Sequence, residues 1–201
     1  MTTTAFTAKD VQELRQRTGA GMMECKRALE DAKGDIDKAV ETLRTKGIAK
    51  ADKRVGKTTS QGLVASYIHH NGKVGVMLEI NCETDFVARN PDFQTLAREI
   101  ALHIASMAPL AIDKSGVPAE AVDRERRIFE EQARQTGKPE QIITKMVEGK
   151  VESYYKDVAL LSQPWVKEPK KTVGDLVKET SAKFGEHIQV RRFVRYQLGE
   201  A

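Results

Sequence analysis

The chain has 201 residues, of which 40% are hydrophobic and 31% are charged, and its formal net charge is +4. This length suits one or two domains, and the 33 basic and 29 acidic residues describe a mixed surface rather than the concentrated positive charge of a nucleic-acid binder. The N-terminus lacks a secretory signal and no apolar run approaches a membrane span, so we expect a cytoplasmic protein.

Cys25 and Cys82 are the two cysteines of the chain. They lie far apart and neither belongs to a CxxC pair, so they do not indicate a disulfide framework. We expect both to be buried free thiols in a reducing compartment.

Residues 1–47 are predicted to form an N-terminal module of three short helices. Apolar side chains recur at helical spacing at Val11 and Leu14, at Met22, Cys25, Leu29 and Ala32, and at Ile36, Ala39, Val40 and Leu43. The pattern resembles a three-helix bundle of the ubiquitin-associated type. With so few core residues, we expect the module to be only marginally stable by itself.

Capping residues set the expected helix boundaries of this module. Thr7 with Asp10 forms a capping-box-like start for the first helix. The three helices are expected to end in turn at Gly19, Gly34 and Gly47.

Residues 48–61 are predicted to be a linker with a solvated run of basic side chains, helical at most in its first half. No aromatic residue interleaves these charges for base stacking, so we do not expect nucleic acid to bind here. Gly56-Lys57-Thr58 copies the end of a phosphate-binding loop, but Ala51 stands where that pattern requires glycine. We therefore expect the isolated chain to bind no nucleotide tightly.

Residues 62–201 are predicted to form an α+β domain that opens with a β-hairpin. Apolar and polar residues alternate on both sides of Asn71-Gly72, a pair that favours a two-residue type I′ turn. The return strand is expected to carry one apolar face at Val74, Val76, Leu78 and Ile80. A helix should follow from Asn90-Pro91 to Pro109, with its sheet-facing side chains at Phe93, Leu96, Ile100, Ile104 and Met107.

A helical hairpin is expected at about residues 117–163, broken at Gly137-Lys138-Pro139. Its second arm carries a coiled-coil-like stripe at Val147, Val151, Tyr154, Val158 and Leu161. Residues 165–171 are interpreted as a connector, and a final helix is predicted from Thr172 to Gly185.

The last strand is predicted at Ile188–Leu198, with Phe193 opposite an apolar face made of Ile188, Val190, Val194 and Tyr196. It completes a three-stranded antiparallel sheet whose open face or edge remains available for pairing. Three arginines near Phe193 are interpreted first as charges that protect an edge strand, second as a protein interface and only third as an RNA contact; they are Arg191, Arg192 and Arg195.

The sequence contains no recognisable constellation of an enzyme or a metal centre. His69 and His70 are expected to point to opposite faces of a strand, which prevents joint metal ligation. Asp35 and Asp37 lack the remaining oxygens of a calcium loop, and no serine lies in a nucleophile elbow. We therefore expect neither catalytic residues nor a bound metal or cofactor.

The most informative stretch is Glu79–Arg89, in which an apolar strand runs into the step Thr84-Asp85-Phe86-Val87. Strand exits present side chains on a rigid support. A lone Phe is more often a core residue, so one interpretation has Phe86 capping the sheet from inside. In the other, the ring is an exposed wedge for a partner's pocket, and the Asp85 carboxylate orients it.

This stretch is similar to the signature of the elongation factor Ts family, the guanine-nucleotide exchange factors of the translational GTPase elongation factor Tu. A second run, Leu14–Leu29, resembles the N-terminal signature of that family, and the remaining chain follows its short form nearly end to end. On the residues alone, a plain interaction module or adaptor is the competing interpretation, since a small bundle beside an α+β domain is generic.

The resemblance implies both a partner and a mechanism. The N-terminal module would grip the GTPase domain of elongation factor Tu, while Phe86 would enter a cleft between two of its helices together with Thr84, Asp85 and Val87. The partner's magnesium contacts and phosphate loop would be disturbed, and GDP would leave. Met22, Met23 and Lys26 match the N-terminal contact region of the family. In the competing interpretation one of the two methionines, Met22 before Met23, is a core residue.

One departure from the family concerns length. Longer members repeat the α+β half, whereas this chain has a single three-stranded half. The short form implies that a second copy supplies what is missing, so we expect a homodimer. No nucleic-acid or membrane partner is expected.

Overall fold

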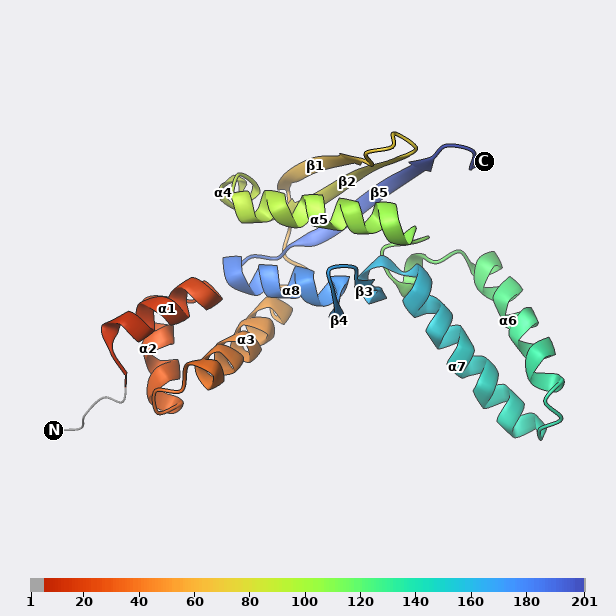
Figure 1. Cartoon of the computed structure of the whole chain (residues 1–201), viewed down its shortest axis with the longest axis horizontal. Coiled ribbons are helices and arrows are strands. Elements are labelled where there is room, and N and C mark those ends of the chain that lie inside the picture. Colours follow the sequence, from red (N-terminus) through yellow and green to blue (C-terminus); the bar gives the residue numbers. More distant parts are fainter. Residues whose placement is uncertain (1–5, 201) are drawn as a thin grey trace. The chain divides into compact units, whose positions relative to one another are not determined.

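The computed structural model describes residues 6–200 and has an α+β architecture, in general as predicted (Figure 1). The α-helices of this part of the chain are α1 Ala8–Thr18, α2 Met22–Asp31, α3 Ile36–Asp52, α4 Asp85–Ala88, α5 Pro91–Met107, α6 Ala119–Arg134, α7 Glu140–Val158 and α8 Val173–Phe184. The strands are β1 Gln61–Ile68, β2 Val74–Cys82, β3 Pro164–Trp165, β4 Glu168–Thr172 and β5 Gln189–Gln197. Two short 3-10 helices complete the set, η1 Lys114–Gly116 and η2 Leu160–Ser162.

The chain divides into two compact units. The described residues of the first unit are 6–63, 81–93 and 177–189. Those of the second are 64–80, 94–176 and 190–200. Each unit is therefore assembled from segments that are far apart in the sequence.

The three predicted N-terminal helices are present as α1, α2 and α3. Thr7 and Asp10 form the capping box at the start of α1, with the Thr7 N–H donating to Asp10 Oδ2 at 2.6 Å. Gly19 ends this helix with a φ of 69°, in the left-handed region that favours glycine. The buried core of the bundle consists of Val11, Leu14, Cys25, Ala28, Leu29, Ala39 and Leu43. The likeness to a ubiquitin-associated bundle stays a prediction.

The third helix is longer than predicted, because α3 passes Gly47 and ends at Asp52. An interior glycine costs a helix only about 1 kcal/mol relative to alanine, which is too little to end a helix that packs against its neighbours. A Cβ at Gly47 would lie 3.1 Å from the Cβ of Ala182 in α8. The glycine therefore permits a close approach of two helices, and the first residues of the predicted linker continue α3.

The larger sheet has the strand order β1-β2-β5 and is antiparallel. The hairpin between β1 and β2 is where predicted, but its turn is not type I′. Non-glycine residues with a positive φ are, among those described, Lys33 and Ala108, so Asn71 does not adopt the conformation that a type I′ turn requires. The Asn71 side chain instead accepts a hydrogen bond from the Lys73 N–H at 3.0 Å, a local bond that favours a longer loop.

The two adjacent histidines of this loop also differ from the prediction. His69 and His70 follow the last residue of β1 and do not lie within the strand. Their ring centroids are 4.2 Å apart, so the alternation of a strand does not separate them. The expectation that they point to opposite faces is therefore wrong.

Helix α5 buries the face that its spacing predicts, except at its last residue. Phe93, Ile100 and Ile104 are fully buried, and Leu96 nearly so. Met107 is 43% exposed, because it ends the helix and the chain turns away at Ala108, which has a positive φ of 45°.

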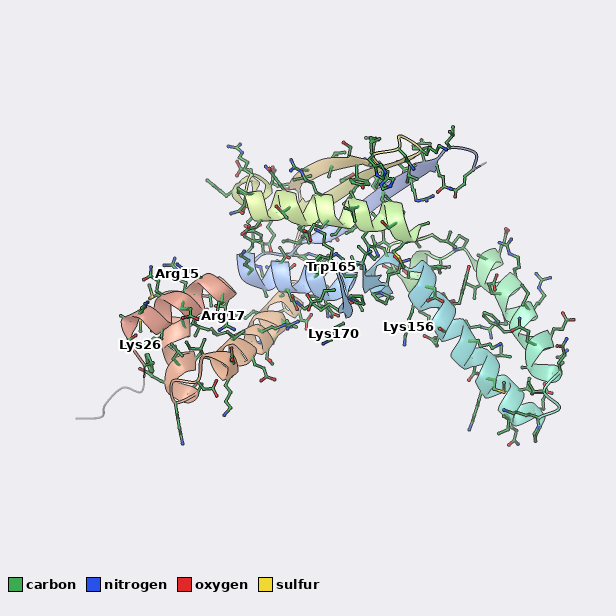
Figure 2. All side chains as sticks on the ribbon, viewed as in Figure 1. Arg15, Arg17, Lys26, Lys156, Trp165 and Lys170 are labelled. Atoms are coloured by element: carbon green, nitrogen blue, oxygen red, sulfur yellow. The ribbon has the colours of Figure 1, made fainter. Side chains whose placement is uncertain are left out.

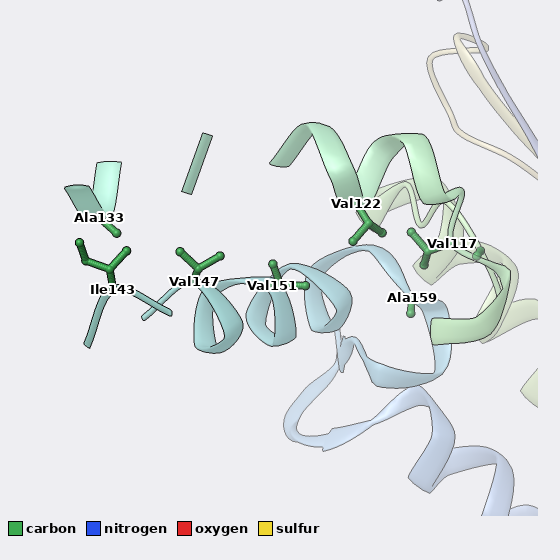
Figure 3. Packing of buried hydrophobic residues seen from close by; sticks show 8 residues of the cluster. Val117, Val122, Ala133, Ile143, Val147, Val151 and Ala159 are labelled. Carbon is green, nitrogen blue, oxygen red and sulfur yellow. The ribbon is translucent and has the colours of Figure 1, made fainter. Parts of the chain in front are cut away.

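The predicted helical hairpin is formed by α6 and α7, with its break at residues 135–139. Figure 3 shows Ile143, Val147 and Val151 of α7 facing the side chains of α6. Tyr154 and Val158 pack at the edge of this cluster. Leu161 lies outside α7, in η2, because the helix ends at Val158.

The segment interpreted as a connector contains a small two-stranded sheet. Strand β3 pairs antiparallel with β4, where Pro164 is opposite Thr172 and Trp165 opposite Glu168. Neither strand carries the apolar alternation that predicts strands from sequence. After it, Thr172 and Asp175 cap α8 as predicted, with the Asp175 N–H donating to Thr172 Oγ1 at 3.0 Å.

A buried polar pair lies beside this small sheet, in the second unit. His103 of α5 and Gln163 are fully buried, with His103 Nε2 2.9 Å from Gln163 Oε1. The Val166 N–H donates to His103 Nδ1 at 3.3 Å, so Nε2 carries the proton of the neutral ring and donates to Gln163. The Gln163 amide then donates to the backbone oxygen of Asp157 at 2.6 Å.

The single apolar face predicted for the last strand is wrong. Ile188 and Val190 are buried, but Val194 is 39% exposed and Tyr196 70% exposed. Phe193 is only partly exposed, so the alternation between buried and exposed positions changes phase between Val190 and Phe193. Over residues 6–200, we find no helix with both the length and the hydropathy needed to cross a membrane.

Candidate functional site

The step Thr84-Asp85-Phe86-Val87 forms a single helical turn at the exit of β2. Thr84 is the N-cap of α4, and its Oγ1 accepts a hydrogen bond from the Val87 N–H at 3.4 Å. Val87 is buried, whereas the neighbouring Phe86 is 83% exposed. Consecutive helical residues point about 100° apart, so the turn that buries Val87 directs Phe86 outward. The interpretation of Phe86 as a core residue is therefore wrong.

An exposed phenylalanine ring leaves a large apolar surface in contact with water. Full burial of such a side chain is worth roughly 1.5–3 kcal/mol relative to leaving it in water. The first unit does not bury the Phe86 side chain, because most of the side-chain surface remains accessible to solvent. The ring is thus available to a pocket on another molecule.

Asp85 is engaged within the chain. Its Oδ2 lies 3.0 Å from a guanidinium nitrogen of Arg89, one turn along, and the two side chains are 46% and 82% exposed. A pair this exposed contributes little to stability. A partner could therefore take over the Asp85 carboxylate at a small cost.

The backbone that leads into this turn is fixed by Glu186, which follows the glycine after α8. Glu186 Oε2 accepts hydrogen bonds from the N–H groups of Glu83 and Thr84, both at 3.1 Å. Glu186 Oε1 accepts a third from the Thr84 hydroxyl at 2.6 Å. One carboxylate thus holds both the backbone and the capping side chain of Thr84.

Glu83 forms the second half of this support. Arg54 donates to both Glu83 oxygens, from Nε at 2.8 Å and from a terminal nitrogen at 2.6 Å, and the His187 N–H donates at 2.6 Å. The hydrogen bond from Arg54 is the largest cause that lowers the pKa of Glu83 to about 2. The same bond raises the pKa of Arg54, so both groups stay charged at neutral pH.

Cys82 is the last residue of β2 and lies beneath the turn. Its thiol donates to the backbone oxygen of Thr84 at 3.2 Å. Burial raises the pKa of the thiol to about 11, so it stays protonated and serves as a packed donor rather than as a nucleophile. Cys25 and Cys82 are both free and buried, as predicted.

The second predicted group lies on the first turns of α2, also in the first unit. Met22 is 47% exposed and Met23 60% exposed, so the expectation that one of them belongs to the core is wrong. Cys25 occupies the buried position instead. Lys26, labelled in Figure 2, has a half-exposed side chain whose nearest acidic oxygen, from Glu30, is 4.0 Å away. The three side chains together present exposed apolar and basic groups on α2.

Two of the three arginines of β5, Arg192 and Arg195, pair with acidic side chains within the second unit. Arg192 Nε lies 2.6 Å from a Glu79 oxygen, and Arg195 pairs with Glu200 at 2.8 Å. Such internal pairs weaken the case for RNA binding and suit an edge strand protected by charge. Within residues 6–200, no three His, Cys, Asp or Glu side chains gather where they could hold a metal ion.

Sequence inspection found the exposed step but missed its support. Glu186 and Arg54 are single charged residues in segments without a motif. Glu186 contacts Thr84 from 102 residues away, and Arg54 contacts Glu83, next to the step, from 29 residues away. The local sequence therefore carries no signal for either residue.

Comparison with known proteins gives a consistent result over nearly the whole chain. A family model described as elongation factor TS matches residues 2–200. A protein of Fervidobacterium nodosum named elongation factor Ts is 53% identical over 195 residues, which are 97% of this chain and 99% of the relative. Proteins of the same name from Oleidesulfovibrio alaskensis and Thermosipho melanesiensis are 52% and 50% identical, and the matches cover 97% of this chain and 98% and 100% of those relatives.

Proposed function

The chain belongs to the elongation factor Ts family of translation factors, and from this premise we propose that it binds GDP-bound elongation factor Tu and promotes the release of GDP. The observation that carries this proposal is Phe86, a ring 83% exposed on a helical turn. The partly buried carboxylates of Glu83 and Glu186 hold the backbone at the start of this turn. A protein that must insert a side chain into a partner needs such an exposed, preorganised group.

The proposed mechanism is a wedge. Phe86 enters a cleft between two helices of the GTPase, and Asp85 exchanges its contact with Arg89 for polar contacts to the partner. Thr84 and Val87 hold the turn during insertion. The partner's magnesium contacts and phosphate loop are displaced, and GDP leaves. Reciprocity requires that GDP weakens the binding of this chain by the same factor by which the chain weakens GDP binding.

The surface of Met22, Met23 and Lys26 is proposed as a second contact with the GTPase domain. Methionine side chains adapt to irregular surfaces, and both are about half exposed here. A second contact increases the binding energy available to hold the wedge in a strained partner. The exchange reaction involves no covalent chemistry, so we propose no catalytic residue, metal or cofactor in this chain, and a location in the cytoplasm.

We further propose that two copies associate through the open face of the larger sheet. In β2, Met77 is exposed between the buried Val76 and Leu78, so one face of this strand is covered and the other is open. The apolar side chains exposed on the strands of the second unit are Val64, Ile68, Met77, Val194 and Tyr196, and Leu198 is exposed directly after β5. A closed two-fold interface is the commonest way to cover such a surface.

The exchange proposal is tested by the release of fluorescently labelled GDP from elongation factor Tu. We expect the rate to rise with the concentration of this chain. Binding to the GTPase without faster release would instead identify an adaptor.

The dimer is tested by sedimentation at tens of micromolar protein, a range suited to a moderately strong dimer. A single 22.4 kDa species would contradict it. Met77→Glu should convert a dimer to monomers.

A further inference from the structure

Glu186 is the residue that ties the Phe86 turn to a distant segment of the chain. Its carboxylate accepts three hydrogen bonds, from the Glu83 N–H, the Thr84 N–H and the Thr84 hydroxyl. We infer that Glu186 is a positioning residue for exchange: it sets the orientation of Phe86 and acts on the partner only through that ring. This inference rests on the proposed exchange function.

The turn requires such support because α4 contains only four residues. A helix this short does not stabilise itself, since nucleation is costly and few internal hydrogen bonds repay it. Its conformation is therefore set at the N-cap. The Thr84 hydroxyl donates to Glu186, which leaves its lone pairs free to accept the Val87 N–H. Glu186 thus aims the oxygen that caps the turn carrying Phe86.

The attachment is reciprocal, so it constrains direction as well as distance. The backbone of Glu83 donates to the Glu186 side chain, while the backbone of His187 donates to the Glu83 side chain. Arg54 holds the same Glu83 carboxylate with two further hydrogen bonds. Two chain segments joined by crossed bonds of this kind resist both sliding and rotation.

Orientation matters for a wedge because an unconstrained ring loses conformational freedom when it enters a pocket. Ordering a side chain and its loop at an interface costs free energy that rigid presentation avoids. Loosening the turn should therefore reduce exchange even where every surface that touches the partner is unchanged. This distinguishes Glu186 from a contact residue.

The test is a double-mutant cycle on the rate of GDP release per concentration of the intact chain. We expect Glu186→Ala to lower this rate about tenfold, the loss expected for hydrogen bonds to a charged group. In a Phe86→Ala background the same substitution should change the rate less than about twofold, because the ring through which it acts is gone. Glu148→Ala, an exposed carboxylate of α7, is the matched control and should keep the full rate.

Glu186→Gln supplies a second variant that preserves volume. Its amide oxygen still accepts the two N–H groups and its NH₂ group can donate to the Thr84 hydroxyl, so we expect a smaller loss of about threefold. That loss should also vanish in the Phe86→Ala background. The glutamine pair decides the question if the alanine variant fails to fold.

The outcomes separate this inference from the proposed function. Unchanged exchange by folded Glu186→Ala, or an equal loss with and without Phe86, refutes the positioning role while the exchange function stands. Failure of the unmodified chain to accelerate GDP release refutes the exchange function and, with it, the role assigned to Glu186.

Discussion

The two polar networks of this protein hold irregular backbone by different chemistry. Around the Phe86 turn, the bonds are made by charged groups, Arg54, Glu83 and Glu186, in a site that remains partly exposed. Around His103 and Gln163, the bonds are made by neutral groups that are fully buried. Charges retain part of their hydration in the first site, whereas full burial in the second would penalise them heavily. The first network supports an exposed ring, and the second joins structural elements.

The largest difference between the networks should appear in stability. Gln163→Ala removes the amide that bonds His103 and the backbone of Asp157, and it leaves buried polar groups without partners as well as a cavity. We expect a loss of about 3 kcal/mol in the free energy of unfolding, measured by urea denaturation. Gln141→Ala, an exposed glutamine of α7, should change it by less than about 0.5 kcal/mol. Equal effects of the two substitutions would contradict a stabilising network.

Phe86→Ala should show the opposite pattern. Because the ring is 83% exposed, its removal should change the free energy of unfolding by less than about 0.5 kcal/mol. Binding to elongation factor Tu should lose about 2 kcal/mol or more, a factor of roughly thirty, and stimulated GDP release should fall at least as far. Calorimetric binding and the release assay measure both. Normal stimulation by the folded variant would show that Phe86 is not the wedge.

Acid should affect the two networks in different pH ranges. Burial lowers the pKa of His103 from its ordinary value of 6.5. The contribution of the neutral ring to the free energy of unfolding is therefore complete above pH 6.5 and is lost as the pH falls below that value. The hydrogen bond from Arg54 lowers the pKa of Glu83 from 4.5 to about 2. The contribution of the ionised carboxylate to the free energy of unfolding is therefore complete above pH 4.5 and is lost as the pH falls towards 2.

Urea denaturation between pH 7 and pH 3 separates these contributions. His103→Gln should remove the decrease in the free energy of unfolding that begins as the pH falls below 6.5. Arg54→Met should reduce the further decrease below pH 4.5. If the free energy of unfolding of His103→Gln still decreases between pH 6.5 and pH 4.5 as in the unmodified chain, groups other than His103 cause this acid sensitivity.

The smallest effect concerns Asp85. Asp85→Ala should lower stimulated GDP release about two- to fivefold, as expected for a partly exposed charged contact, with unfolding changed by less than about 0.5 kcal/mol. Arg89→Ala is the matched control, because it breaks the same internal pair and leaves the carboxylate for the partner. If Arg89→Ala reduces release as much as Asp85→Ala, the internal pair matters and the proposed contact of Asp85 with the partner does not.

The sequence by itself determined the features that depend on local periodicity and capping. The three N-terminal helices, the capping boxes of α1 and α8, the hairpin strands and the break between α6 and α7 all follow from nearby residues. It also located Thr84–Val87 by resemblance. That step could be found because its residues are contiguous and end a regular strand.

Only the tertiary structure decided the features that depend on distant neighbours. Gly47 fails to end α3 because a helix from the far end of the chain packs against it, and β3 and β4 form without an apolar pattern because they pair with each other. Phe86 is exposed because Val87 occupies the inward position of its turn. Glu186 meets Thr84 from 102 residues away, and no pattern in a local window encodes a contact at that separation.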